Sequence, residues 1–288
     1  MVEPPVFLAV DAATVDLTAD DQVLAEAIVA AGREAVPVIW GERLPAAATL
    51  AIRSTWDYVE DADRFAAWLD QLDVDGVAVH NPTSLLRWNL HKGYLPDLAR
   101  HGVPTVPTVV VPRGQRVDVG QLLHRHGWDD AVVKPAIGGT ARLAVHVDAI
   151  GIVAAQRHVE ELLVDEDAVV QQFVASVPST GEISVIVIGG VVTHAIRKRA
   201  AEGDWRVQSE YGGTSEPIVV DDRLATAARA AVAAVHPSPT YARIDLVEGL
   251  TGQLQLIELE LVEPELFFGS CLQAATRMAD LLTNGADH

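Results

Sequence analysis

Short apolar runs alternate with helix-length segments along residues 6–79, and this alternation constrains the fold more than any other feature of the sequence. Four runs have the length and composition of buried strands: Val6–Val10, Val36–Trp40, Leu50–Arg53 and Val77–Val79. Apolar residues recur with helical spacing in Asp20–Ala31, which Asp20 is expected to cap, and in Asp61–Leu72. Strands that alternate with helices predict a parallel α/β layer at the start of the chain.

Two common phosphate-binding loops are absent from this layer. It contains neither the GxGxxG turn of dinucleotide-binding sheets nor a GxxxxGK[ST] loop. A nucleotide, if the protein binds one, must therefore be held in another way.

The rest of the chain is expected to form two further units that are rich in hairpins. The strands expected in the first unit are Val109–Val111, Ala131–Lys134, Arg142–Val147 and Val169–Val174, with helices over Val117–His126 and Ala149–Leu163. The second unit begins with an alternating hairpin that turns at Gly189 and Gly190, and it ends with the strands Thr240–Val247 and Leu254–Leu261 and a final helix. We therefore predict a mixed α/β and α+β fold in three parts, residues 1–88, 89–170 and 171–288.

The formal charge of the chain excludes two classes of partner. Its 288 residues carry a net charge of −19, and the resulting long-range field repels nucleic acids and anionic membranes. An anionic ligand such as ATP therefore requires a local basic pocket. The single cysteine, Cys271, allows no disulfide framework. Because we find neither a basic stretch followed by an apolar run at the N-terminus nor an apolar segment of membrane-spanning length, we expect a cytoplasmic protein.

Lysine is rare in this chain: against eighteen arginines stand Lys92, Lys134 and Lys198. Lys134 lies within the apolar segment Ala131–Pro135, where an ammonium group without an anionic partner is costly. This position favours a phosphate ligand, although the side chain can also extend from the end of the strand into water. Gly138 and Gly139 follow in a flexible loop, which can present backbone N–H groups to phosphate or form an ordinary hairpin turn.

Three carboxylates are expected to gather near the end of the chain. Because side chains alternate along a strand, Arg243 and Asp245 share one face of their strand, and Glu258 and Glu260 share one face of the next. If the two strands form a hairpin, Asp245 lies opposite Glu258, with Cβ atoms roughly 5 Å apart. Such close carboxylates repel one another unless Arg243 or a bound metal supplies positive charge. Their oxygen atoms suit Mg²⁺ bridging nucleotide phosphates, so the cluster favours a metal site.

A basic run, Arg197-Lys198-Arg199, lies in the earlier hairpin, and Arg206 follows a little further on. Alternation directs Arg197 and Arg199 to one face of the strand and Lys198 to the other. The residues alone leave two interpretations open, a solvated basic edge or a patch that balances the charge of phosphate and substrate carboxylate. The polar segment Glu202–Gly213 holds three glycines and is our candidate for a lid over the site.

Taken in order, these residues resemble the ATP-grasp superfamily over residues 85–270. The resemblance rests on Lys92, Lys134-Pro135 with its glycine loop, Gln171-Gln172-Phe173-Val174, Glu182, Arg199, Asp245, Glu258 and Glu260. It implies an ATP-grasp fold in which an N-terminal α/β domain precedes two ATP-grasp subdomains that enclose the nucleotide. It also implies a ligase that activates a carboxylate as an acyl phosphate and joins it to an amine as an amide.

The resemblance also implies roles for individual residues. ATP-binding residues would be Lys92, Lys134, Gly138, Gly139, Gln171, Gln172, Phe173 and Val174, with the Gln171–Val174 backbone on adenine, and Glu182 on the ribose hydroxyls. Two Mg²⁺ ions, replaceable by Mn²⁺, would be held by Asp245, Glu258 and Glu260, and the candidate catalytic residues are Arg199, Arg206 and Arg197. The sequence departs from the family pattern at Glu260, where Asn is usual, and at Gln171, where Glu is often found.

Three further stretches are similar to one bacterial subgroup of these ligases, which includes the enzyme that closes the ring of D-cycloserine. They are Arg53-Ser54-Thr55-Trp56-Asp57-Tyr58, Asn81-Pro82 and Trp88-Asn89. Arg53 ends a strand of the first layer, and open α/β sheets bind ligands at such strand ends. Candidate substrate-binding residues are therefore Arg53, Ser54, Thr55 and Asp57, whereas residues such as Trp56 and Tyr58 more often pack between domains than touch substrate.

The implied partners are small molecules, a carboxylate and an amine, and neither nucleic acid nor membrane. Ring closure within one amino-acid-like molecule, as in antibiotic biosynthesis, and the joining of two molecules by an amino-acid or dipeptide ligase both stay open, as does assembly into a homo-oligomer. An alternative of another class is a protein that senses ATP without turnover. The retention of all three carboxylates and of both lysines argues against a sensor, because ATP binding alone does not need a full metal site.

Overall fold

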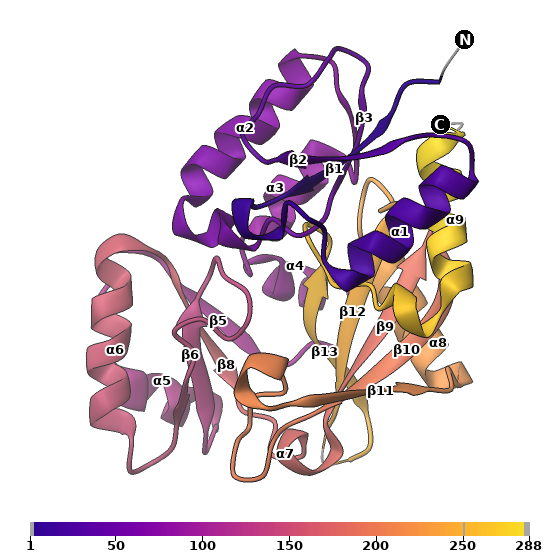
Figure 1. The fold of residues 1–288 in the computed structure, drawn as a ribbon. Helices are drawn as coiled ribbons and strands as arrows, with labels where there is room; N and C mark the ends of the chain where they lie inside the picture. Colours follow the sequence, from indigo (N-terminus) through magenta and orange to yellow (C-terminus); the bar gives the residue numbers. More distant parts are fainter. Residues whose placement is uncertain (1–2, 250, 285–288) are drawn as a thin grey trace.

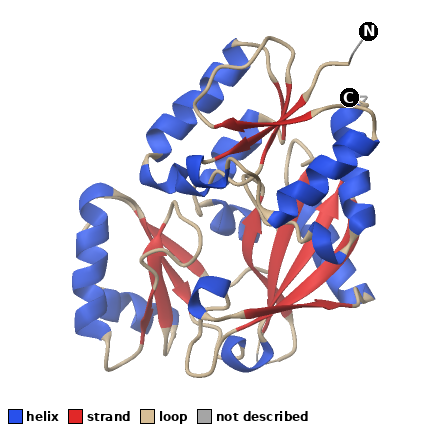
Figure 2. Cartoon of the chain, viewed as in Figure 1, coloured by secondary structure: helices blue, strands red, loops and turns tan. Residues whose placement is uncertain are grey.

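Three β-sheets with helices packed against them make up the computed structural model, which describes residues 3–249 and 251–284 (Figure 1; Figure 2). The predicted mixed α/β and α+β fold is confirmed. Each sheet falls largely within one of the three predicted parts of the chain. The exception is β8 (Ala168–Gln172) of the second sheet, which runs across the predicted boundary at residue 170. The division into 1–88, 89–170 and 171–288 stays a prediction, and its terminal residues 1, 2 and 285–288 lie outside the described part.

The first sheet is parallel and has the strand order β2-β1-β3-β4. Its strands are β1 (Val6–Val10), β2 (Ala35–Ile39), β3 (Thr49–Ile52) and β4 (Ala78–His80), close to the predicted runs. Helix α2 (Ala62–Val74) packs on the face that carries Leu50 and Ile52, and α1 (Ala19–Ala30) packs on the face of Ala51. The predicted parallel α/β layer is thus covered by helices on both faces.

Helix α1 differs from the prediction at its start, where Thr18 rather than Asp20 is the N-cap. The Thr18 hydroxyl accepts the backbone N–H of Asp21 over 3.1 Å. Asp20 lies in the first turn, and its carboxylate accepts the N–H groups of Leu266, over 2.9 Å, and of Phe268. The prediction was wrong because both residue types cap helices well, and a contact with a distant segment decides between them.

The second sheet is antiparallel and has the order β5-β8-β6-β7. Its strands are β5 (Thr108–Val111), β6 (Ala131–Pro135), β7 (Val145–Val147) and β8 (Ala168–Gln172). Helices α5 (Val119–His126) and α6 (Ile152–Asp165) pack on the face that carries Ala131 and Val133. Alternation leaves Val132 and Lys134 on the opposite face of the sheet.

Strand β7 is shorter than predicted, because the chain before it forms a loop. Three non-glycine residues there have left-handed φ angles: Thr140 at 47°, Ala141 at 53° and Leu143 at 52°. Such angles cannot continue a strand. Arg142, where the strand was expected to begin, instead donates two hydrogen bonds of 3.1 Å to the carboxylate of Glu166.

The third sheet is antiparallel and has the order β11-β10-β9-β12-β13. Its strands are β9 (Glu182–Ile188), β10 (Val191–Arg199), β11 (Thr214–Ile218), β12 (Tyr241–Glu248) and β13 (Leu254–Glu260). Both predicted hairpins are present, and Asp245 lies opposite Glu258 as predicted. The final helix α9 (Leu272–Thr283) lies beside α1 and so joins the end of the chain to the first domain (Figure 1).

Alternation along these strands separates the core from a polar face. Ile183 and Val185 of β9 and Ile244 of β12 point to one side, where α4 (Tyr94–Arg100) and α8 (Asp222–Ala233) bury them. Glu182 and Asp245 occupy alternate positions on the same strands and point to the other side. The apolar side therefore orients the sheet, and the charged side is left to face the second sheet.

Several elements, most of them short, were not predicted from the sequence. They are α3 (Thr83–Leu90), α4, α7 (Val177–Thr180), α8, β11 and the 3₁₀ turns Ala12–Thr14, Trp56–Glu60, Ser209–Tyr211 and Phe268–Ser270. In α3 the helical pattern is obscured because Asn89 is buried and bonds to the backbone of β13. Within the described residues, no helix combines the length and apolar character needed to span a membrane.

Candidate active site

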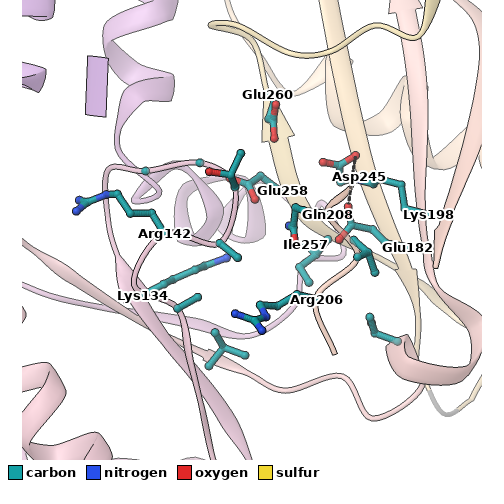
Figure 3. Close-up of a pocket in the computed structure, with 18 of the residues that line it drawn as sticks. Lys134, Arg142, Glu182, Lys198, Arg206, Gln208, Asp245, Ile257, Glu258 and Glu260 are labelled. Atoms are coloured by element: carbon teal, nitrogen blue, oxygen red, sulfur yellow. Dashed lines mark ion pairs between the residues drawn. The ribbon is translucent and has the colours of Figure 1, made fainter. Parts of the chain in front are cut away.

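A cavity of about 610 Å³ lies between the second and third sheets. Figure 3 shows Lys134 and Arg142 on the side of the second sheet, with Glu182, Lys198 and Asp245 on the side of the third. All three lysines of the chain line this cavity. In a protein of net charge −19, the cavity therefore gathers the positive groups that an anionic ligand requires, together with carboxylates.

Lys198 lies between two carboxylates of neighbouring strands. Its Nζ atom pairs with the carboxylate of Glu182 and lies 3.5 Å from Oδ1 of Asp245. Burial alone would lower the pKa of Lys198, but Asp245 and Glu182 hold it above its ordinary value. Ser184 donates a further hydrogen bond to Asp245. Lys198 is therefore a fixed positive charge, while burial raises the pKa of Glu182.

Arg243 pairs with the carboxylates of Asp245 and Glu260. The sequence had left open whether Arg243 or a bound metal supplies positive charge to this cluster. The Nη2 atom of Arg243 lies 3.0 Å from Oδ2 of Asp245 and also pairs with Glu260. Burial opposes ionisation of Asp245, yet Arg243 and Lys198 hold its pKa below the usual value. Burial raises the pKa of Glu260 to about 8, because one shared guanidinium does not offset the loss of water.

The other two lysines differ in their partners. Nζ of Lys92 lies 3.0 Å from Oε1 of Glu258 and also donates to the carbonyl of Gly138. Burial would raise the pKa of Glu258, but Lys92 and Lys134 hold it below its ordinary value. Lys134 itself forms no ion pair with any residue that the structure describes, and burial lowers its pKa. An ammonium group that faces a cavity without a fixed partner suits a phosphate.

The three predicted metal ligands fit a divalent cation by chemistry but do not converge on one point. Asp245, Glu258 and Glu260 all line the cavity, and carboxylate oxygens are the ligands that Mg²⁺ prefers. Among the residues described, however, no three His, Cys, Asp or Glu side chains lie close enough to hold one ion. Each carboxylate pairs with Lys92, Lys198 or Arg243 instead. Nucleotide phosphates could pair with these cationic side chains and so free the carboxylates to bind a metal ion. The metal site is therefore compatible with this arrangement and stays a prediction.

The residues predicted to bind the nucleotide line the same cavity: Lys92, Lys134, Gly138, Gly139, Gln171, Gln172, Phe173, Val174 and Glu182. Two N–H groups of the predicted adenine segment are already used. That of Gln172 donates to the carbonyl of Pro107 over 2.9 Å, and that of Phe173 donates to the backbone carbonyl of Asp130 over 3.1 Å. Contacts to adenine would therefore fall to the other backbone groups of this segment.

Of the three predicted catalytic arginines, the structure brings Arg206 to the cavity. Its guanidinium lies 2.7 Å from a carboxylate oxygen of Asp204 and 3.6 Å from the ring centroid of Tyr211. Hydrogen bonds from Arg206 lower the pKa of Asp204. All of these residues belong to the segment Glu202–Gly213, our candidate lid, and Val207 in its middle is buried.

Arg197 and Arg199 are not brought to the cavity. Nη1 of Arg197 donates to the carbonyl of Thr180 over 2.7 Å, and Nε of Arg199 lies 3.2 Å from Glu216. Lys198, between them, lines the cavity instead. The predicted alternation is therefore present, and a catalytic role for Arg197 and Arg199 stays a prediction. The rarity of lysine was the sequence signal that could have pointed to Lys198. Arg243 was likewise not among the candidate site residues.

A second cavity of about 100 Å³ adjoins the first, and we call it the side cavity. Its lining residues are Thr18, Ala19, Asp20, Arg53, Ser54, Trp56, Glu263, Pro264 and Glu265, of which Trp56, Glu263 and Glu265 also line the main cavity. Two of the predicted substrate-binding residues, Arg53 and Ser54, therefore face it. The other two are placed elsewhere: Asp57 accepts a hydrogen bond from Trp40, and the Thr55 hydroxyl is buried.

Comparison with family models divides the chain into two matched segments. Residues 98–261 match the RimK-like ATP-grasp domain, and residues 6–81 match the N-terminal domain of D-cycloserine synthetase DcsG. The segment 98–261 contains both sheets that enclose the main cavity. The segment 6–81 contains Arg53 and Ser54 of the side cavity.

Two curated proteins illustrate the range of relatives. The chain is 32% identical over 244 residues to the cycloserine biosynthesis protein DcsG of Streptomyces lavendulae, covering 81% of this chain and 81% of that protein. It is 30% identical over 200 residues to the tetrahydromethanopterin:alpha-L-glutamate ligase of Methanosarcina acetivorans, covering 64% of this chain and 58% of that protein.

Solved structures give the same picture. The crystal structure of D-cycloserine synthetase DcsG is similar with a TM-score of 0.87 at 30% identity, over 97% of this chain and 98% of that one. The D-alanine--D-alanine ligase from Bacillus anthracis shares the fold with a TM-score of 0.66 at 15% identity, over 98% of this chain and 97% of that one.

Proposed function

The chain belongs to the RimK-like ATP-grasp family and is a carboxylate–amine ligase, and we propose that it closes a cycloserine-type ring within one small amino-acid-like molecule. The observation that carries this proposal is the extent of the likeness to DcsG. It covers 97% of the chain in the structural comparison, and it includes an N-terminal segment that matches a domain model named for that enzyme.

In the proposed first step, a carboxylate oxygen of the substrate attacks the γ-phosphorus of ATP. The bond between the carboxylate oxygen and the γ-phosphorus forms, and the bond from the γ-phosphorus to the bridging oxygen breaks. ADP leaves, and the substrate becomes an acyl phosphate. Lys92, Lys134 and Lys198 line the cavity and would balance the phosphate charge. Divalent ions bound by Asp245, Glu258 and Glu260 would supply further positive charge.

In the proposed second step, a nitrogen of the same molecule attacks the acyl carbon. The C–N bond forms, the bond to phosphate oxygen breaks, and the nitrogen loses a proton as phosphate leaves. Arg206 is the predicted arginine that lines the cavity, and we assign it the oxyanion of the tetrahedral intermediate. Because water hydrolyses an acyl phosphate, the segment Glu202–Gly213 would exclude water from the site.

Incubation with ATP, Mg²⁺ and a serine derivative that carries an aminooxy group tests this proposal. We expect ADP release that depends on the acid, and a product lighter than the substrate by one water in the mass spectrum. A panel of ureido derivatives and of both enantiomers would then define the preferred substrate. The absence of any acid-dependent ADP release or cyclic product across the panel would contradict ring closure.

A second candidate function is the joining of two molecules by an intermolecular ligase, which the likeness to the glutamate ligase favours. Product mass distinguishes the two, because an intermolecular ligase adds the mass of a second amine. The alternative of an ATP sensor without turnover is set aside, since the relatives are named ligases or biosynthetic enzymes.

A further inference from the structure

The side cavity has an excess of negative charge. Its charged lining residues are three carboxylates, Asp20, Glu263 and Glu265, and one guanidinium, Arg53. The main cavity beside it holds the three lysines of the chain. A ligand that reaches from the side cavity into the main cavity therefore passes from a mainly acidic lining to one in which lysines and arginines accompany the carboxylates.

The positive charge of Arg53 is already balanced within the fold. Its Nε atom lies 2.8 Å from Oδ1 of Asp21, and Nη2 lies 3.4 Å from Oδ2 of Asp20. Asp20 also accepts the backbone N–H groups of Leu266 and Phe268. One guanidinium is thus shared by two carboxylates, and it leaves no positive charge for Glu263 or Glu265.

Glu263 and Glu265 have no cationic partner within residues 3–249 and 251–284. Neither carboxylate takes part in an ion pair there, and Arg243 reaches the backbone carbonyl of Glu265 rather than its side chain. Burial raises the pKa of Glu263 to about 7, as expected for a carboxylate that loses water without gaining a cation. Glu263 therefore lacks an ion-pair partner that would offset the loss of water, because the more distant Lys92 and Arg243 lower its pKa only in part.

Arg53 supplies an independent observation that points to a ligand. The residue is 2% exposed, and its Nη1 atom is buried without a hydrogen-bond partner among the described residues. Leaving a buried guanidinium N–H unbonded is unfavourable. Arg53 lines the side cavity, so a ligand bound there can place an oxygen acceptor beside this guanidinium.

We propose that the side cavity binds the substrate through a primary ammonium group held by Glu263 and an oxygen atom that accepts from Nη1 of Arg53. This subsite rests on the proposed function and adds the residues that hold the amino group of the amino-acid-like substrate. Trp56, which lines both cavities, supplies an apolar surface beside the ligand. Acids without the amino group are bound weakly.

The subsite also selects which nitrogen reacts. An ammonium group paired with Glu263 has no lone pair and cannot attack the acyl phosphate. A second, uncharged nitrogen of the substrate is the nucleophile, which directs the reaction toward ring closure rather than toward coupling through the amino group.

Two cyclic probes that differ by one amino group test the proposal: D-cycloserine and isoxazolidin-3-one, the same ring without the amine. Calorimetric titrations are made with the wild type, Glu263→Gln and the surface control Glu34→Gln, in ADP and Mg²⁺. In the wild type and in Glu34→Gln, we expect D-cycloserine to bind at least about tenfold more tightly than isoxazolidin-3-one. In Glu263→Gln this preference should disappear, while ADP affinity stays unchanged.

Equal binding of both rings to the wild type, or an unchanged preference in Glu263→Gln, would overturn the subsite and leave ring closure standing. If the wild type binds ADP but neither ring, the result counts against the proposed ring closure, and the subsite fails with it.

Discussion

The side-chain amide of Asn89 brackets Glu260 by bonding to the backbone on both sides of it. Nδ2 of Asn89 donates to the carbonyl of Leu259 over 2.8 Å, and the N–H of Leu261 donates to Oδ1 over 2.8 Å. The hydroxyl of Tyr94 accepts the N–H of Leu259 over 3.1 Å. Because β13 is an edge strand, these side chains occupy the place of a further strand and fix the backbone that carries Glu260.

Asn89→Leu is expected to weaken metal binding more than nucleotide binding. The change leaves a buried carbonyl and a buried N–H of β13 without partners, at about 1–3 kcal/mol each. The predicted metal ligand between them then loses its fixed backbone. We expect the Mg²⁺ concentration for half-maximal ADP release to rise about tenfold or more, with a smaller change in KM for ATP.

Gln156→Leu is the matched control for this experiment. Nε2 of Gln156 donates to the carbonyl of Val117 over 2.8 Å, and the N–H of Val119 donates to Oε1 over 2.9 Å, so the same two-point contact occurs between α5 and α6. Its loss should lower the melting temperature without changing the Mg²⁺ dependence. Equal Mg²⁺ shifts in both variants would show that Asn89 acts through general stability alone.

Asp245→Asn and Glu258→Gln should each reduce ADP production by more than about a hundredfold, while circular dichroism shows a folded protein. The fold is expected to persist because Lys198 keeps Glu182 as a partner and Arg243 keeps Glu260. Near wild-type turnover at saturating Mg²⁺ in either variant would identify that carboxylate as structural.

Lys134→Met should weaken ATP binding about tenfold or more, because it removes a charged phosphate ligand. Without ligand, the melting temperature should stay the same or rise, since the buried ammonium has no fixed anionic partner. Lys92→Met is the comparison, and it should lower the melting temperature because Lys92 pairs with Glu258. A loss of stability in Lys134→Met with unchanged ATP affinity would contradict the phosphate assignment.

The stability of the ligand-free protein should fall as pH rises from 4.5 to about 7 through the contribution of Glu263. Burial raises the pKa of this carboxyl from 4.5 to about 7 in the folded chain, so the folded state binds the proton more tightly than the unfolded state does. The stability that the protonated carboxyl contributes at pH values below 4.5 is lost as the carboxyl of the folded protein ionises. In Glu263→Gln the melting temperature should therefore decline less between pH 5 and about pH 8, whereas the surface variant Glu34→Gln should follow the wild type.

The sequence by itself determined most of the strands and much of their pairing. Alternation along two predicted strands was enough to place Asp245 opposite Glu258, because a hairpin of antiparallel strands fixes which residues face each other. The rarity of lysine in an acidic chain marked Lys92, Lys134 and Lys198, and all three line one cavity. The order of these residues along the chain also sufficed for the ATP-grasp resemblance, which the family comparison confirms.

The tertiary structure decided which face of each strand became the site. Along β10 both Ala195 and Ile196 are buried, so the apolar pattern does not reveal that Lys198, rather than Arg197, points into the cavity. Arg53 shows the same limit, because the acidic partners that hold it come from the start of α1. Local periodicity fixes the relation between neighbouring side chains, whereas burial and charge pairing depend on segments far apart in sequence, which only the packed fold brings together.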